Sequence, residues 1–246
     1  MITANDCSAL LSVAQRTPRS VSQLQVLYAD NHCLAVAKPA KLLTAGDRTG
    51  DETLLEHCKA YVKQTYGKPG NVYLGLVHRL DRPTSGVVLF ARTSKAAARL
   101  AQQFRDGTIA KSYLAILEGR PATEEGEFVD WLAKDSAANR VRVAKPRERG
   151  AKQSHLRYRV RQFGDGRTLV EVRPLTGRSH QIRVQFAARG MPIVGDRKYG
   201  ARRGLGGKIA LHAASLQFRH PTRDETLTVT APQPEYFDEL LNAGNA

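Results

Sequence analysis

Residues 77–107 read VHRLDRPTSGVVLFARTSKAAARLAQQFRDG, a polar loop followed by an apolar run and a helical pattern. Gly86–Ala91 has the length and composition of a buried strand. Thr93 or Ser94 can cap the helix that follows, and Gly107 is typical of a helix C-terminus. This stretch therefore predicts a polar loop held at the entrance of a buried strand, whose neighbours must come from elsewhere in the chain.

Strand and turn patterns flank this stretch on both sides. Leu24–Ala29 and Cys33–Ala37 are apolar runs around a polar Asp-Asn-His triplet, which is typical of a hairpin. Residues 156–160 alternate apolar side chains with arginines, and 168–172 follows across a Gly-Asp-Gly turn. Further strands are predicted at 73–77, 110–117, 128–132, 209–218 and 226–230, and helices at 51–66, 179–188 and 234–241.

The predicted elements mix strands, hairpins and helices without the regular alternation of a doubly wound parallel sheet. We therefore expect an α+β fold with a mixed, mostly antiparallel sheet flanked by helices. The polar, basic stretch 135–152 is interpreted as a loop or hairpin, and the Gly-rich stretch 202–207 as a mobile loop.

Positive charge is concentrated in one part of the chain. The 246 residues carry 38 Lys and Arg against 23 Asp and Glu, and 18 of the basic residues fall within 140–203 beside only four acids. A field of one sign attracts polyanions, and phosphate contacts supply most non-specific nucleic-acid affinity. We therefore favour a nucleic-acid partner over a basic surface that only keeps the protein in solution. A membrane surface is less favoured, because no basic amphipathic helix with an aromatic face is present.

Several protein classes and cofactors are disfavoured by absent patterns. No apolar run is long enough for a transmembrane helix, and the N-terminus lacks the pattern of a secretory signal. Cys7, Cys33 and Cys58 are odd in number and widely spaced, which suits a reducing compartment such as the cytoplasm. Since no phosphate-binding glycine motif and no metal-binding His or Cys spacing occurs, we expect no nucleotide cofactor and no metal.

The loop HRLDRPTSG at 78–86 is the strongest candidate for chemistry. Asp81 lies between Arg79 and Arg82, and neighbouring cations favour an ionised carboxylate. Such a group can act as a nucleophile or a general base. Taken alone, an ordinary turn with Pro83 and Gly86 supplying the geometry explains the loop better.

Four blocks of sequence together resemble the RluA family of pseudouridine synthases. They are HRLDRPTSG (78–86), KSYLA (111–115), LTGRSHQIRV (175–184) and LHAASL (211–216), with PIVGD (192–196) and Tyr199-Gly200 matching as well. The blocks stand in family order between about residues 24 and 232. The resemblance implies a pseudouridine synthase catalytic fold with an RNA-binding cleft.

The resemblance further implies isomerisation of uridine to pseudouridine in structured ribosomal or transfer RNA, with no cofactor. The catalytic residue of the family corresponds to Asp81, the tyrosine that packs on the target base to Tyr113, and the arginine that pairs with the aspartate to Arg183. Arg79 would help to displace the target nucleotide and Leu211 would line the base pocket. The other block residues expected to bind substrate are His78, Leu80, Arg82, Thr84, Arg178, His180 and Gln181.

Each of these residues also has a purely structural interpretation. Tyr113 could be a surface aromatic of a strand, Arg183 a phosphate contact, His180 a structural hydrogen-bond partner and Leu211 a core residue. Two rival activities also stay open. One is a non-catalytic RNA-binding or ribosome-assembly protein on the same fold, and the other is a hydrolase with two carboxylates. The four blocks contain no second acid.

For the domain organisation, we expect a partly disordered lead-in at 1–22 and a single catalytic domain at 23–243. Because this lead-in is short, we expect no separate N-terminal RNA-binding domain. The choice of target is therefore expected to depend on the catalytic domain and its basic segment, residues 134–208. We expect a cytoplasmic monomer.

Overall fold

Strand β4 (Ser85–Ala91) is buried over its whole length, as its apolar sequence predicts. Its side chains alternate between two apolar clusters: Val87 and Leu89 belong to one, and Val88 and Phe90 to the other. Because both faces of the strand are apolar, both must be covered. Helix α2 (Ser94–Asp106) packs on the first cluster through Ala96 and Leu100, and helix α1 (Leu54–Thr65) packs on the second.

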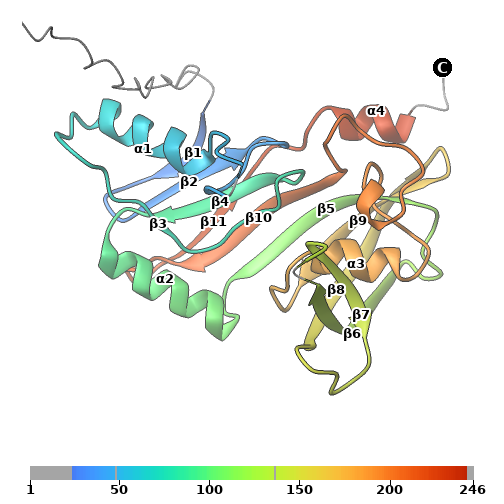
Figure 1. Ribbon diagram of the computed structural model, residues 1–246. Coiled ribbons are helices and arrows are strands. Elements are labelled where there is room, and N and C mark those ends of the chain that lie inside the picture. Colours follow the sequence, from blue (N-terminus) through green and yellow to red (C-terminus); the bar gives the residue numbers. More distant parts are fainter. Residues whose placement is uncertain (1–23, 48, 136, 243–246) are drawn as a thin grey trace, which may run out of the picture.

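The computed structural model describes residues 24–47, 49–135 and 137–242, so the predicted lead-in at 1–22 lies outside the described residues. Its strands form one sheet of eleven, along which the main path is β1-β2-β4-β10-β5-β9-β8-β6-β7, while β3 pairs with β4 and β11 with β10 (Figure 1). The strands are β1 Gln25–Ala29, β2 Cys33–Lys38, β3 Gly75–Leu76, β4, β5 Ala110–Glu118, β6 Glu125–Asp135, β7 Arg140–Ala144, β8 Lys152–Gly164, β9 Arg167–Pro174, β10 Leu211–Arg219 and β11 Thr226–Thr230.

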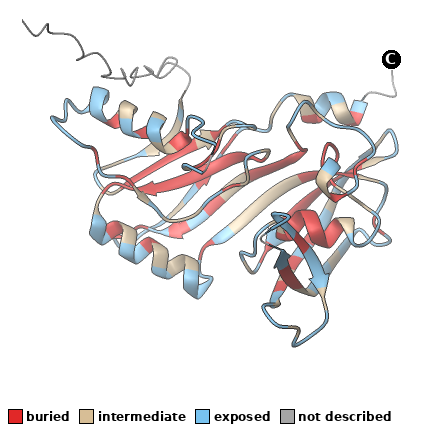
Figure 2. Cartoon of the chain, viewed as in Figure 1, coloured by how far each residue is buried: buried red, intermediate tan, exposed pale blue. Residues whose placement is uncertain are grey.

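In the described part of the chain, four α-helices cover the sheet. They are α1 Leu54–Thr65, α2 Ser94–Asp106, α3 Gln181–Ala187 and α4 Tyr236–Asn242. In Figure 1, α1 and α2 lie over the half of the sheet that contains β1 to β4, whereas α3 lies beside β6 to β9. Figure 2 shows the central strands buried and the outer helix faces exposed. Among the described residues, no helix is both long enough and apolar enough to cross a membrane.

The pairing of β4 with β10 is parallel, whereas the other pairings in the described sheet are antiparallel. Gly86 makes this pairing possible. Its φ is +118°, and a side-chain carbon there would lie 2.2 Å from the carbonyl oxygen of Ala213. The glycine that closes the HRLDRPTSG loop is thus required by the close approach of β10, which enters the sheet between β4 and β5.

The predicted fold class, a mixed and mostly antiparallel sheet flanked by helices, is confirmed. Both predicted hairpins are present, and 135–152 forms a hairpin between β6 and β7 before it joins β8. Gly107 is the left-handed C-cap of α2, as its position predicts. In the predicted mobile loop, Leu205 and Lys208 form a bridge, and Gly204 bridges Gly195.

Several predicted boundaries were wrong. The strand predicted at 73–77 is only β3, and the short strand at 128–132 is the eleven-residue β6. Helix α1 begins after Thr53, because Thr53 and Glu56 form a capping box. Helix α3 begins two residues later than predicted, because His180 adopts a left-handed conformation with φ +51°.

Candidate active site

Asp81 lies in the loop between β3 and β4, and the backbone on both sides of it is fixed by hydrogen bonds. The hydroxyl of Thr44 donates to the Leu80 carbonyl at 2.9 Å and accepts from the Leu80 N–H at 3.2 Å. The N–H of Thr84 donates to the Asp81 carbonyl at 3.0 Å. The buried ammonium of Lys38 donates to the carbonyl of Arg82 at 3.2 Å. The carboxylate of Asp81 is therefore presented from a fixed turn.

Arg183 joins two carboxylates in the interior. Its Nη1 donates to Asp81 Oδ2 at 2.8 Å, while Nε and Nη2 donate to the two oxygens of Asp196 at 2.6 and 2.9 Å. The side chains of Arg183 and Asp196 are 5% and 2% exposed, whereas that of Asp81 is 30% exposed. The hydrogen bonds and charges of the two carboxylates outweigh burial and raise the pKa of Arg183. The guanidinium is therefore a fixed cation beneath the open carboxylate of Asp81.

Only one oxygen of Asp81 is engaged by the described residues. Both Arg183 and the nearby His180 face Oδ2, and no hydrogen bond reaches Oδ1. One oxygen is thus held by the arginine, and the other is available to a ligand in the cleft. This is the arrangement that a nucleophile or a general base requires.

His180 lies beside Asp81 and is oriented by Tyr199. The Tyr199 hydroxyl accepts from the Val141 N–H at 3.0 Å and lies 2.6 Å from His180 Nδ1. Because a hydroxyl oxygen can accept two hydrogen bonds and donate one, this contact orients the His180 ring in either of its tautomers. Nε2 is 3.7 Å from Asp81 Oδ2, which is too long for a hydrogen bond. Burial lowers the pKa of His180 more than Asp81 raises it.

Tyr113 and Leu211 come together because β10 and β5 are neighbours. Tyr113 pairs with Ala213 and Leu211 with Ala115 in the register of these two strands. Both residues line the same cleft as Asp81. Burial and, to a smaller extent, Asp81 raise the pKa of Tyr113, so its hydroxyl is protonated at neutral pH. Tyr113 thus offers a ring and a hydroxyl donor rather than a phenolate.

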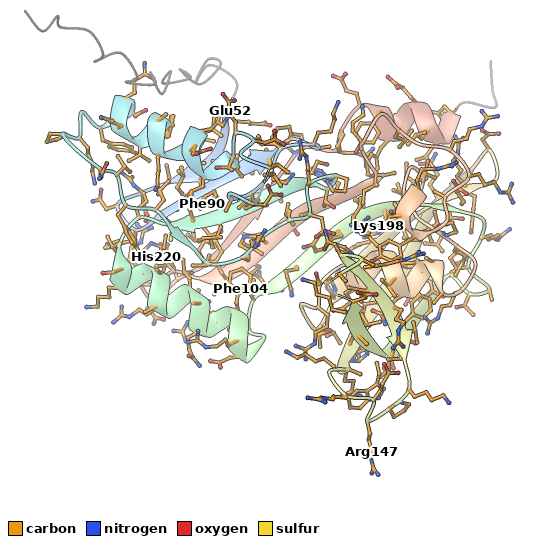
Figure 3. All side chains as sticks on the ribbon, in the orientation of Figure 1. Glu52, Phe90, Phe104, Arg147, Lys198 and His220 are labelled. Atoms are coloured by element: carbon orange, nitrogen blue, oxygen red, sulfur yellow. The ribbon has the colours of Figure 1, made fainter. Side chains whose placement is uncertain are left out.

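All twelve residues that the sequence singled out line one cleft of about 1230 Å³. They are Asp81, Tyr113, Arg183, Arg79, His78, Leu80, Arg82, Thr84, Arg178, His180, Gln181 and Leu211. The walls include the end of α2 with Phe104 and the short 3-10 helix η2 (Arg197–Tyr199) with Lys198, both residues being labelled in Figure 3. Residues more than 130 positions apart in the chain thus share one surface.

Several of these twelve side chains are already engaged by protein atoms. His78 stacks on Phe104 at 4.7 Å, and its Nε2 accepts from the Leu89 N–H. The side-chain amide of Gln181 bonds to Thr176, to the Arg178 N–H and to the carbonyl of His155. His78 and Gln181 therefore form part of the cleft wall, with their polar atoms bound by protein groups.

Arg82, Arg178 and Thr84 also face protein groups. Arg82 forms an ion pair with Asp51 at 2.7 Å, and the Nε of Arg178 donates to the carbonyl of Gln153. The buried hydroxyl of Thr84 has no hydrogen-bond partner among the described residues. Part of each of the two guanidinium groups is therefore held by the protein.

Four residues of the site were not given a role by the sequence. Asp196 and Tyr199 fall in the family-like blocks but carry no local signal that they would hold Arg183 and His180. Lys111 and Lys198 are lysines of the cleft wall. Lys111 lies two residues before Tyr113 on the same predicted strand. This spacing indicates that the two side chains lie on the same face of the strand.

Much of the positive charge on β8 and β9 is neutralised within the protein. Arg157 pairs with Glu127 at 3.2 Å, and Arg159 pairs with Glu125 at 2.7 Å. Arg161 and Arg173 both pair with Glu171. In contrast, Lys145, Arg147 and Arg149 are exposed and form no ion pair with described residues. They lie on the β7–β8 connection, and Figure 3 shows Arg147 at its tip.

One group of potential metal ligands, Asp30, Cys33 and His220, occurs in the described part of the chain. The Oδ2 of Asp30 already accepts from Tyr28, His220 and Arg223, and its Oδ1 accepts two backbone N–H groups. Burial, and to a smaller extent Asp30, raises the pKa of Cys33 to about 12, so its thiol is not ionised. This cluster therefore ties β1 to the end of β10 rather than offering ligands to a metal.

Comparison with known proteins agrees with this cleft. Residues 32–188 match the family model described as RNA pseudouridylate synthase. The chain belongs to this family. Its members are isomerases that convert uridine to pseudouridine in RNA.

Similar proteins cover most of the chain. An uncharacterised RNA pseudouridine synthase of Bacillus subtilis is 36% identical over 218 residues, which is 89% of this chain and 71% of the relative. Ribosomal large subunit pseudouridine synthase C of Escherichia coli is 34% identical over 225 residues, which is 88% of this chain and 68% of the relative. Human RNA pseudouridylate synthase domain containing 1 superposes with a TM-score of 0.73 at 29% identity, covering 92% of this chain and 89% of that structure.

Proposed function

We propose that the chain isomerises specific uridines in structured ribosomal or transfer RNA, with Asp81 as the catalytic residue and the target base flipped into the cleft. The observation that supports this proposal most is the carboxylate of Asp81. It is bound through Oδ2 by the buried Arg183 and has Oδ1 open to the cleft. The relatives named for the ribosomal large subunit make ribosomal RNA the first substrate to test.

The reaction breaks the bond between N1 of uracil and C1′ of the ribose and joins C5 to the same C1′. The hydrogen on C5 is lost and N1 gains one, so substrate and product are isomers. Asp81 Oδ1 adds to the sugar or the base or removes a proton, and Arg183 keeps Asp81 fixed through Oδ2. Uracil stacked in a helix cannot reach this carboxylate, so the nucleotide must leave the stack.

Tyr113 and Leu211 would hold the flipped base. An aromatic ring is a stacking surface for an unstacked base, and Leu211 on the neighbouring strand adds an apolar wall. Because the hydroxyl of Tyr113 is protonated at neutral pH, it would donate a hydrogen bond to the base. Any proton removal by Tyr113 would require a partner such as Asp81 to accept its own proton first.

The test uses the purified chain and an unmodified transcript of large-subunit ribosomal RNA from the source cell. Pseudouridines are mapped by carbodiimide labelling and primer-extension stops. We expect one or a few sites with the wild type and none with Asp81→Asn. The matched control is Asp106→Asn, which changes another carboxylate of the same cleft and should retain all sites. Free uracil in place of pseudouridine, or equal activity of Asp81→Asn, would contradict the proposal.

A further inference from the structure

Lys111 is a cation of the cleft with no partner in the protein. It lies on β5 two residues before Tyr113, so the two side chains leave the same face of the strand. Both line the cleft with Asp81. Within the described residues, the ammonium of Lys111 takes part in no hydrogen bond or ion pair, although it is partly buried. A buried charge without a partner is costly, so an anionic ligand would be stabilised here.

The surroundings of Lys111 leave one side of its ammonium open. The Nζ lies 3.7 Å from the point at which a side chain on Gly177 would begin. Gly177 is exposed and lies in the strip between β9 and α3, directly before Arg178. On the other side lies His78, whose pKa is lowered by burial and, to a smaller extent, by the charge of Lys111. The ammonium of Lys111 therefore lies at the cleft beside Gly177, where no side chain blocks the approach of a ligand.

The other cations of the cleft are either engaged or exposed at the rim. Arg183 binds Asp81 and Asp196, and Lys198 donates to the carbonyl of Asn139. Arg79 and Lys134 form no ion pair with described residues, but both are solvent-exposed. Lys111 is thus the cation that is both inside the cleft and unengaged within the described chain.

We propose that Lys111 binds a backbone phosphate of the RNA next to the flipped uridine, an inference that rests on the function proposed above. Two positions along a strand span about 6.8 Å, so a base on Tyr113 would place its own backbone near Lys111. An ammonium is a compact charge with three donors, which suits a phosphate. Gly177 keeps the approach of the backbone open.

The test compares Lys111→Gln, which keeps a donor without the charge, with Lys111→Arg, which keeps the charge. Lys63→Gln, on the exposed surface of α1, is the matched control. Binding of a twelve-residue oligouridylate is measured over a range of salt concentrations. Isomerisation is measured as tritium released from C5-labelled transcript of large-subunit ribosomal RNA. Thermal unfolding of each variant verifies the fold.

We expect Lys111→Gln to bind RNA about tenfold more weakly, as for a lost charge-assisted contact. The slope of log affinity against log salt should fall by about 0.7, the value of one single-strand phosphate. KM should rise about tenfold and kcat should change less than about twofold, since the contact is made equally before and during the reaction. Lys111→Arg should restore the salt slope, and Lys63→Gln should match the wild type.

Two results would overturn the proposal. One is an unchanged salt slope in Lys111→Gln, which would place Lys111 on the base or in no contact. The other is a Lys111→Arg variant as impaired as Lys111→Gln. Neither depends on catalysis, because the binding measurement stands by itself. If the wild type released no tritium while the slope of Lys111→Gln fell, the function proposed for Asp81 would fail and the phosphate contact would remain.

Discussion

Arg183 and Arg159 come from the same basic stretch of sequence, yet the structure uses them in opposite ways. Arg183 is 5% exposed and is shared by Asp81 and Asp196. Arg159 is 59% exposed and forms a single pair with Glu125, itself 61% exposed. A buried ion pair that loses one partner leaves an uncompensated charge, whereas an exposed pair is screened by water. The comparison teaches that charge alone does not tell a site residue from a surface residue, because burial sets the energy of each pair.

The strongest way to break this comparison is to remove Arg183. Arg183→Gln would leave Asp196 buried at 2% exposure without its cation and Asp81 without its anchor. We expect a loss of about 3–5 kcal/mol in the free energy of unfolding, measured by urea titration. Arg178→Gln, an exposed arginine five residues earlier, is the control and should cost less than about 0.5 kcal/mol. A loss below about 1 kcal/mol in Arg183→Gln would show that this network is not a buried one.

A second test concerns His78, which lines the same cleft as Arg183. Burial, together with the charge of Lys111, lowers the pKa of His78 from 6.5 to about 3. Between these two values the unfolded chain binds a proton that the folded chain does not, so stability falls as pH falls from 6.5 toward 3. His78→Gln lacks this loss. Its stability deficit against the wild type should therefore shrink by about 1.4 kcal/mol for each pH unit below 6.5.

The measurement is urea unfolding of both proteins between pH 7 and pH 4. Subtracting the two curves removes the groups that the proteins share. A difference that is independent of pH would mean that His78 titrates alike in the folded and unfolded chains. That result would contradict its placement against Phe104 and the Leu89 N–H.

The smallest effect on stability is expected for the exposed pair of Glu125 and Arg159. A double-mutant cycle on Glu125 and Arg159, each replaced by Ala alone and together, should give a coupling energy of about 0–1 kcal/mol. Raising the salt concentration should reduce it further, because the pair is open to solvent. Thermal or urea unfolding of the four proteins measures the coupling. A coupling above about 2 kcal/mol would mean that burial does not distinguish this pair from the Arg183 network.

Local elements of the fold were predictable where neighbouring residues decide them. The apolar run of β4, the hairpin of β1 and β2 and the left-handed Gly107 at the end of α2 all depend on residues a few positions apart. The prediction failed at α3, where no local pattern indicates the left-handed His180. His180 is held by Tyr199, which is nineteen positions later in the chain.

The candidate site was predictable only as a set of residues. Combined blocks of sequence identified Asp81, Tyr113, Arg183 and Leu211, and the structure gathers these on one cleft. Their interplay could not be predicted from local pattern, because the two partners Asp81 and Arg183 are 102 positions apart. Asp196 was missed for the same reason, since an Asp in a Val-Gly-Asp turn gives no sign of a buried partner.

The sequence by itself determined the α+β class, the polar loop before a buried strand and the excess of basic residues, because each is a property of composition or of near neighbours. Only the tertiary structure decided which charges cancel and which remain for a ligand. The entry of β10 between β4 and β5 brings Leu211 beside Tyr113. The acids of β6 neutralise arginines of β8, whereas Lys111 meets no acid among the described residues. An ion pair depends on distance in space and on burial, and the sequence gives neither until the sheet is assembled.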